Sequence, residues 1–329
     1  QTELIFDGGS CAINKDGKTI AMAPFFIENF HVIDLFGASI TSTIEQVTPS
    51  KNELIFKALT CGIRDYFSKQ NFKQAILGLS GGIDSALTLV LAVAALGKEN
   101  VLAVLLPSGF SSNHSIEDAL ALVKNLDCKH QLLPIEDNFQ SLLKTLKPSF
   151  EGTEFGLAEE NIQARLRGVL LMAISNKFGY ILLNTSNKSE MAVGYGTLYG
   201  DMCGGLAVIG DVYKTQVYKL SNYINREREI IPMNSIIKPP PAELRPGQKD
   251  SDSLPEYDIL DAILFQYIEL KKSSSAIIEQ GFEESLVKRV LRMVNIAEFK
   301  RNQAPPILRV SPKAFGMGRR LPIVGKYLS

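Results

Sequence analysis

The chain has 329 residues, of which 45% are hydrophobic and 21% charged, and its 35 basic and 35 acidic side chains give a net charge of zero. This is an ordinary globular composition, long enough for more than one domain and without the basic excess of a nucleic-acid binder. With no membrane-length apolar run, no signal-like start and four separated cysteines without a CxxC pair, we expect a cytoplasmic protein with neither membrane nor nucleic-acid partners.

Short strands are predicted for residues 1–35. The runs with strand-like composition are 3–6, 10–13, 18–22 and 31–35, with a turn at Asn14-Lys15-Asp16-Gly17. So few short strands rarely form a stable unit alone. We therefore interpret residues 1–35 as a fragment of a β-rich domain and residues 36–50, rich in Ser, Thr and Gly, as a linker.

Strands and helices alternate between residues 53 and 226. Helical spacing of apolar residues predicts helices at 53–69, 85–96, 115–126, 161–178 and 214–226. Continuous apolar runs predict strands at 75–79, 101–106, 131–135 and 180–184. Such runs are typical of parallel strands that are covered on both sides. The predicted fold class is therefore α/β, a Rossmann-like parallel sheet with helices on both faces.

The character of the chain changes after residue 236. Residues 238–255 are polar and rich in proline, which predicts a loop, and helices are expected at 257–270 and 283–302. The tail from residue 304 carries five cations and no acid: Arg309, Lys313, Arg319, Arg320 and Lys326. The loop and the tail either close over a site and exclude water, or are a solvated linker and tail. The sequence favours neither alternative.

The motif SGGIDS follows a predicted strand and begins a predicted helix, so that backbone N–H groups and the positive end of the helix dipole face an anion. Gly81 and Gly82 permit a tight turn, and the hydroxyls of Ser80 and Ser85 supply further donors. Asp84 would repel a bare phosphate, so we expect it to hold Mg²⁺ against one. A glycine turn capped by serines is the alternative, but the position between strand and helix favours a phosphate-binding site.

The SGGxDS pattern resembles the signature of the ATP pyrophosphatase family, whose members cleave ATP between the α- and β-phosphates to form an adenylate. Three later segments resemble its NAD synthetase branch. They are NIQARLR from Asn161, the stretch from Thr185 through Glu190 to Asp201, and GDVYKT around Lys214.

This resemblance implies roles for individual residues. Asn161, Arg165 and Arg167 would bind ATP and the deamido-NAD substrate, although two arginines on a surface helix are also common. Thr185 would contact the ATP phosphates, and Glu190 would be the second Mg²⁺ ligand beside Asp84, unless it only caps a helix.

Three residues are expected to act in catalysis: Asp84, Asp201 and Lys214. By resemblance, Asp201 would lie near the nicotinate carboxylate of the substrate. A cation at a helix start is unfavourable, so Lys214 should have an anionic partner such as a phosphate, the acyl-adenylate or Asp201.

Resemblance also extends to the two ends of the chain. Residues 241–258 and 299–323 are similar to the glutamine-dependent branch of NAD synthetases, with Pro241 where that branch usually has a hydroxyl residue. Residues 1–35 resemble the end of a nitrilase-like glutaminase domain, whose nucleophile, glutamate and lysine would lie upstream. Cys11 is then expected to be a small buried side chain in a strand. The implied domains are 1–35, a linker 36–50 and a synthetase domain 51–329.

The implied reaction is amidation of deamido-NAD to NAD through an acyl-adenylate, with ATP and Mg²⁺ as cofactors and AMP and pyrophosphate as products. Ammonia would come from glutamine in a full-length protein and from free ammonium for this chain alone, and a homodimer or larger homo-oligomer is expected. One alternative is a tRNA-modifying ATP pyrophosphatase, which would show a basic face and often reactive cysteines. Another is a non-catalytic nucleotide-binding module, which would lack Asp84 or Glu190.

Overall fold

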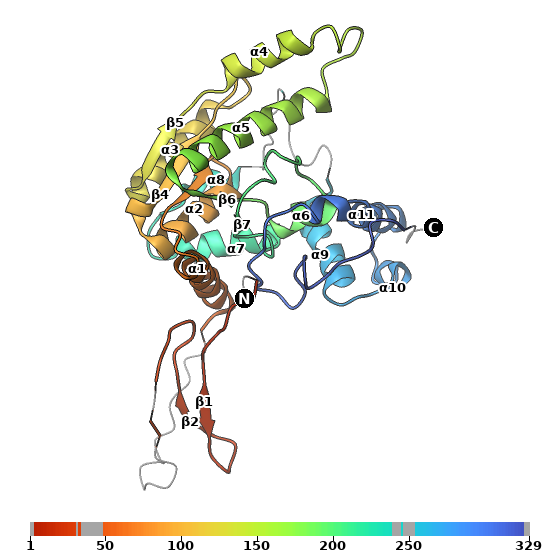
Figure 1. Cartoon of the computed structure of the whole chain (residues 1–329). Coiled ribbons are helices and arrows are strands. Elements are labelled where there is room, and N and C mark those ends of the chain that lie inside the picture. Colours follow the sequence, from red (N-terminus) through yellow and green to blue (C-terminus); the bar gives the residue numbers. More distant parts are fainter. Residues whose placement is uncertain (1–2, 31, 34–48, 239–244, 246–253, 326–329) are drawn as a thin grey trace.

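A five-stranded parallel sheet organises most of the molecule in the computed structural model, which describes residues 3–30, 32–33, 49–238, 245 and 254–325 (Figure 1). The strands are β3 (Ala75–Gly78), β4 (Val101–Leu105), β5 (Lys129–Leu132), β6 (Ile181–Asn184) and β7 (Leu206–Ala207). Their order is β5-β4-β3-β6-β7, and every neighbouring pair is parallel. The predicted α/β fold class is confirmed.

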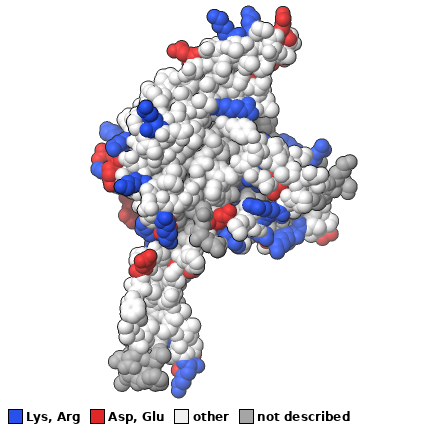
Figure 2. Space-filling model, in the orientation of Figure 1, with Lys and Arg blue, Asp and Glu red and all other residues white. Residues whose placement is uncertain are grey.

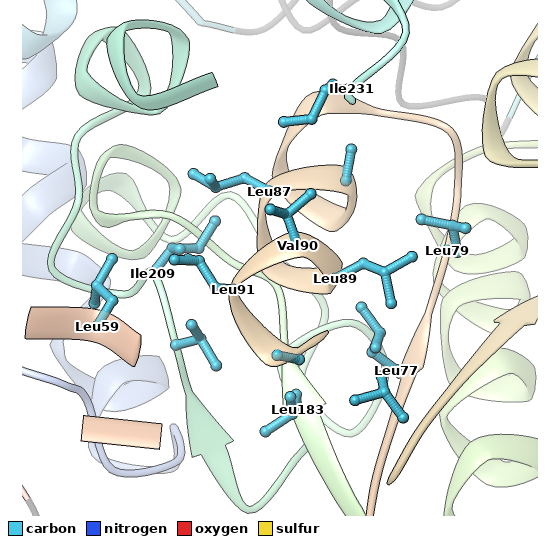
Figure 3. Close-up of a cluster of buried hydrophobic side chains, with 14 of the residues drawn as sticks. Leu59, Leu77, Leu79, Leu87, Leu89, Val90, Leu91, Leu183, Ile209 and Ile231 are labelled. Carbon is cyan, nitrogen blue, oxygen red and sulfur yellow. The ribbon is translucent and has the colours of Figure 1, made fainter. Parts of the chain in front are cut away.

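Helices cover both faces of the sheet, which explains why its central strands are apolar throughout. On one face lie α1 (Lys51–Lys69), α2 (Ile83–Leu96), α3 (Asn113–Leu126) and α7 (Lys214–Ile224). The other face carries α5 (Leu157–Phe178), with α4 (Glu136–Leu146) alongside it. Successive residues of β3 serve the two layers, because Leu77 joins the first core and Ile76 the second. Figure 3 shows Leu77 and Leu79 facing Leu89 of α2.

A third core lies beyond β7. It is formed by α6 (Lys188–Val193), α9 (Tyr257–Ile268), α10 (Ser274–Ile278) and α11 (Glu284–Ile296), with Phe315 from the tail. The single helix expected at 283–302 is wrong, since α11 ends at Ile296 and α12 (Glu298–Arg301) follows. At this break the buried guanidinium of Arg301 turns back to the carbonyls of Val294 and Ala192.

The tail is part of the body rather than a free extension. The carbonyl of Pro306 accepts a hydrogen bond from Ala207 N at 2.8 Å, and Ile307 pairs with Ala207 in a parallel bridge, so the tail extends the sheet at β7. Val310 N and Ser311 N both donate to the buried carboxylate of Asp211. Lys326 and Pro241 lie outside the described residues.

The N-terminal residues form an arm that projects from the body (Figure 1). It contains one antiparallel hairpin, β1 (Cys11–Ile13) with β2 (Thr19–Met22). The strand expected at 3–6 is absent: this segment runs along the body, where Glu3 O accepts from Arg309 N at 2.9 Å. Of the strand expected at 31–35, only residues 32–33 are described, and they are not a strand. The expectation that Cys11 is buried is wrong, because no other described segment of the chain covers it and it lies exposed in β1.

Several boundaries differ from expectation where polar residues occur in regular elements. The edge strand β5 is Lys129–Leu132 rather than 131–135, and all four of its residues are exposed. A strand with no covered face carries no apolar run to identify it. Four helices were not expected: α4, α6, α10 and α8 (Met233–Ile237). Within the described part of the chain, no helix combines the length and apolar character that crossing a membrane would require.

Candidate functional site

A cavity of about 700 Å³ opens at the carboxyl ends of the sheet strands. Its walls include residues that directly follow β3, β4 and β6, which is where open α/β sheets bind ligands. Of the twelve residues proposed from the sequence, eleven line it: Ser80, Gly82, Asp84, Ser85, Asn161, Arg165, Arg167, Thr185, Glu190, Asp201 and Lys214. Segments separated by more than 100 residues therefore converge on one space.

Gly81, the twelfth residue, does not line the cavity but shapes its wall. Its φ of +79° lies in the left-handed region, and a Cβ there would be 2.1 Å from the carbonyl oxygen of Ser115. Ser235 Oγ donates to Gly81 O at 3.0 Å from the other direction. Only glycine fits this position, because both the conformation and the close backbone approach exclude a side chain.

The phosphate loop is organised by its own serines. The hydroxyl oxygens of Ser80 and Ser85 are 3.1 Å apart, and Ser80 Oγ accepts from Gly82 N at 3.2 Å. Helix α2 begins at Ile83 with Gly82 as N-cap, so no side chain caps it. The first N–H groups of the helix therefore suit an anionic ligand in the cavity.

Asp84 and Glu190 face the same ammonium group. Lys214 Nζ is bonded to Asp84 Oδ2 and lies 3.8 Å from Glu190 Oε1. Asn187 Nδ2 donates to the other oxygen of Asp84 at 3.0 Å. The lysine side chain is only 2% exposed, so these carboxylates are needed to stabilise its buried charge. Lys214 therefore has an anionic partner, as expected, but the protein carboxylate bonded to it is Asp84, whereas the candidate expected within the protein from the sequence was Asp201.

Glu190 also caps a helix, which was the alternative reading of its position. Asn187 Oδ1 accepts from Glu190 N at 3.0 Å, and Glu190 Oε2 accepts from Asn187 N at 3.3 Å, forming a capping box on α6. The two readings are compatible, because Oε2 serves the cap while Oε1 points toward Lys214.

The third core fixes the backbone at Lys214. Ser189 Oγ accepts from Lys214 N at 2.9 Å, and Asp261 Oδ2 accepts from Thr215 N at 2.9 Å. These bonds cap α7, whose own N-cap residue supplies no side-chain bond. Burial raises the pKa of Asp261, and its hydrogen bonds from Ser189 and Thr215 oppose that shift. The ring of Tyr257 lies 5.2 Å from Lys214 Nζ. Helix α9 therefore helps to position Lys214 at the start of α7.

The two arginines of α5 point to different walls of the cavity. Residues two apart on a helix are separated by about 200° around its axis. Accordingly, Arg165 Nε donates to Leu198 O at 3.2 Å, whereas Arg167 Nε donates to Leu106 O at 3.0 Å. Asn161 Oδ1 accepts from Thr197 Oγ1 at 2.6 Å. The segment was expected at a helix start, but α5 begins one turn earlier, at Leu157.

Asp201 opens onto the cavity with protein around the rest of its carboxylate. Desolvation raises its pKa to about 6, opposed by the hydrogen bond from Thr197 N at 2.5 Å and by the charges of Lys300 and Arg167. Lys300 Nζ donates to Gly194 O at 2.8 Å and Gly196 O at 2.7 Å. Burial lowers the pKa of Lys300, and Asp201 partly offsets this.

Lys300, Asn187, Ser235 and Lys238 were not singled out from the sequence. Lys300, Ser235 and Lys238 line the cavity, and Asn187 supports Asp84. A polar stretch that follows an apolar strand could have indicated Asn187. No local pattern marks Lys300, since it reaches the cavity from α12 through contacts more than 100 residues apart in the chain.

The donor set suits a hard divalent cation. Asp84 and Glu190 present two carboxylates to one point, and Mg²⁺ commonly binds one or two protein carboxylates together with substrate phosphates and water. Within the described ranges, no cluster of three or more His, Cys, Asp or Glu side chains forms a site that would hold a metal by protein groups alone.

Comparison with known proteins places the chain in a family. The family model "NAD synthase" matches residues 55–304. The "Glutamine-dependent NAD(+) synthetase" of Synechocystis sp. is 52% identical over 98% of this chain, and the chain spans 58% of that relative's length.

Two solved structures are similar over most of the described fold. A glutamine-dependent NAD⁺ synthetase from Acinetobacter baumannii, in complex with ADP, is 41% identical with a TM-score of 0.68, over 97% of this chain and 59% of that one. An NH3-dependent NAD synthetase from Campylobacter jejuni is 29% identical with a TM-score of 0.61, over 80% of this chain and 100% of that one. By the family model, the identity and the shared fold, this chain belongs to the NAD synthase family.

Proposed function

We propose that this chain carries the site that amidates deamido-NAD to NAD, with ATP and Mg²⁺, through an acyl-adenylate. The observation that carries the proposal is the convergence of Asp84, Glu190 and Lys214 beside an uncapped helix start in one large cavity. The ADP bound by the relative from A. baumannii supports nucleotide binding in this fold.

The residues of the chain divide the first step between them. The substrate carboxylate attacks the α-phosphorus of ATP, and pyrophosphate leaves. Asp84 and Glu190 would hold Mg²⁺, which supplies charge neutralisation to the phosphates. Lys214, whose ammonium lies against both carboxylates, would offer its charge to the phosphate anions beside them. Ser80, Gly82 and Ser85 offer donors to the leaving pyrophosphate, and Thr185 lines the same cavity.

Asp201 serves the second step in this proposal. Ammonium must lose a proton before its nitrogen attacks the acyl carbon, and the C–O bond to AMP then breaks. A carboxylate with a pKa of about 6 is ionised at neutral pH and can attract ammonium and accept that proton. In the match with the C. jejuni enzyme, whose name states NH3 dependence, 80% of this chain covers the entire length of that enzyme.

The arm supports the proposed domain division into residues 1–35, a linker 36–50 and a synthetase domain 51–329. Most of the visible surface of the arm carries no charge (Figure 2). Its exposed large apolar side chains include Phe6, Ile13, Ile27, Phe30 and Val32. Such a surface is typical of one that is covered by further polypeptide. We propose that the arm belongs to a glutaminase unit that supplies ammonia in a longer protein. We also propose that the chain acts in the cytoplasm.

Helix α5 supports a homodimer. Its outward face carries exposed apolar residues, including Val169 at 63% and Met172 at 37% exposure, although its inner face already packs on the sheet. Apolar side chains on both sides of a helix indicate a second packing partner.

On the face in Figure 2, acidic and basic side chains are interspersed rather than gathered in a basic band, which argues against a tRNA substrate.

The nitrogen source tests the proposal. Purified 329-residue chain is incubated with deamido-NAD, ATP, Mg²⁺ and either ammonium or glutamine, and NAD, AMP and pyrophosphate are measured. We expect the three products in equal amounts with ammonium and none with glutamine. Nicotinate mononucleotide and tRNA replace deamido-NAD as controls. Product formation with either control but not with deamido-NAD would contradict the proposed substrate, and glutaminase activity would contradict the domain division.

A further inference from the structure

Lys238 is held at the cavity wall by a mostly buried ion pair. Its Nζ lies 3.0 Å from Asp118 Oδ2 and 3.1 Å from Ser115 Oγ. The two charged side chains are 15% and 11% exposed. Asn234 Nδ2 donates to the same Asp118 oxygen at 2.7 Å, so the carboxylate is fixed by two partners from the α8 region.

The Lys238 ion pair is adjacent to the phosphate loop. The backbone of Ser115 is in direct contact with Gly81, and Ser235, three residues before Lys238, donates to Gly81 O. Lys238 lines the same cavity as Ser80 and Ser85. The starts of α3 and α8 therefore form the outer side of the loop, with the lysine ammonium at its edge.

The charges in the cavity indicate what this lysine is for. A triphosphate carries roughly four negative charges at neutral pH, and a divalent cation balances only two of them. Lys214 lies at one side of the loop, close to Asp84 and Glu190. Lys238 approaches from the side of Gly81. Burying an ion pair costs desolvation, and a pair of apolar side chains would fill this wall at lower cost. An ammonium with three N–H groups, two directed to Asp118 and Ser115, is suited to a phosphate oxygen.

We propose that Lys238 binds the β- and γ-phosphates of ATP, and that Asp118 is its positioning residue. The proposal rests on the proposed function, because it assumes ATP in this cavity. Lys238 then recognises the part of the nucleotide that leaves as pyrophosphate. It contributes to binding ATP and not to binding AMP, which distinguishes it from a residue that only stabilises the loop.

The test compares two nucleotides by isothermal titration of the whole chain. The probes are α,β-methylene-ATP with Mg²⁺, which is not cleaved at the α–β bond, and AMP. We expect Lys238→Met to weaken binding of the ATP analogue about 10-fold or more, the scale of one charge-assisted contact, and to leave AMP affinity unchanged. Lys238→Arg should retain most of the analogue affinity. Asp118→Asn should weaken it by a smaller factor, because the lysine stays but is less well oriented.

The matched control is Lys124→Met, a charge removal on the exposed face of α3. Analogue affinity in Lys238→Met within twofold of the Lys124→Met value would overturn the inference, as would equal weakening of analogue and AMP. Failure of the unmodified chain to bind the analogue would contradict the proposed function and the inference together. The two failures are distinguishable, because the unmodified chain binds the analogue if only the inference is wrong and does not bind it if the proposed function is wrong. Weakened binding of the analogue in Lys238→Met alone agrees with both.

Discussion

The two carboxylate oxygens of Glu190 have different partners. Oε2 completes the capping box of α6, while Oε1 lies 3.8 Å from Lys214 Nζ. From the sequence, Glu190 could be a helix cap or a metal ligand, because an acid in the first turn of a helix fits either role. The structure shows that one side chain has the geometry for both, with the cap fixing the orientation of the oxygen that faces the cavity.

Substitutions of the two carboxylates should lower activity alike but stability differently. Glu190→Gln preserves the capping box, since glutamine also serves at that position, so its unfolding midpoint should match the unmodified chain. Asp84→Asn removes the closest counter-ion of buried Lys214 and should be destabilised. Each should reduce kcat/KM for pyrophosphate release by about 100-fold or more, since a charged group at the phosphates is lost. Near-normal turnover in either variant would refute the metal assignment.

The pKa of Asp201 predicts an acid limb in the activity profile. Because its carboxyl has a pKa of about 6 rather than 3.8, it is ionised above that pH and protonated below it. If the ionised form accepts the proton of ammonium, ammonium-dependent kcat/KM should fall as the pH drops through about 6. In Asp201→Asn the activity should be low and this limb absent. A limb at the same pH in the variant would assign it to another group.

At the scale of elements, the segments that converge on the site are tied together by buried charges. Lys188 Nζ contacts Asp211 Oδ1 at 2.8 Å, and also Glu269 of the α9 region. The same Asp211 carboxylate holds the tail through Val310 N and Ser311 N. The residues of each contact are 23 to 100 positions apart in sequence, so no local pattern predicts their pairing. The phosphate loop, in contrast, is a local strand-turn-helix unit and could be predicted.

Asp211→Asn should destabilise the chain. The substitution removes a charge bonded to Lys188, Val310 and Ser311 in a fully buried setting. We expect a loss of about 2–3 kcal/mol in the free energy of unfolding, the scale of hydrogen bonds to a charged group. Asp65→Asn, which breaks the exposed pair with Lys69, is the matched control and should cost under about 1 kcal/mol. Equal urea midpoints for the two variants would show that the Asp211 network does not stabilise the fold.

The whole molecule was predicted from sequence as an α/β sheet protein with a separate N-terminal fragment, and the sheet is confirmed. Helices near α9 and α11 of the third core were also predicted, but α6 and α10, which complete this core, were not, because such short helices have too few turns to show a helical period. The exposed arm and the outward face of α5 were also not distinguishable from core segments, since apolar sequence does not state which partner covers it.

The proposed dimer is tested at the outward face of α5. Val169→Glu places a charge on a side chain that is 63% exposed, so the monomer should fold normally and only self-association should suffer. Light scattering with size-exclusion chromatography should show a dimer for the unmodified chain and a monomer for the variant. Ile296→Glu on α11, 59% exposed in the unmodified chain, is the control and should remain dimeric. A dimer that survives Val169→Glu would place the interface elsewhere.

The central claim is that the cavity joins a carboxylate to the α-phosphate of ATP before nitrogen enters. Deamido-NAD labelled with ¹⁸O in its nicotinate carboxylate tests this directly, because an acyl-adenylate retains one carboxylate oxygen on phosphorus when the C–O bond breaks. With ammonium, ATP and the purified chain, mass spectrometry should find one ¹⁸O in the phosphate of AMP and none in pyrophosphate. Label in inorganic phosphate, or unlabelled AMP alongside NAD, would contradict the account.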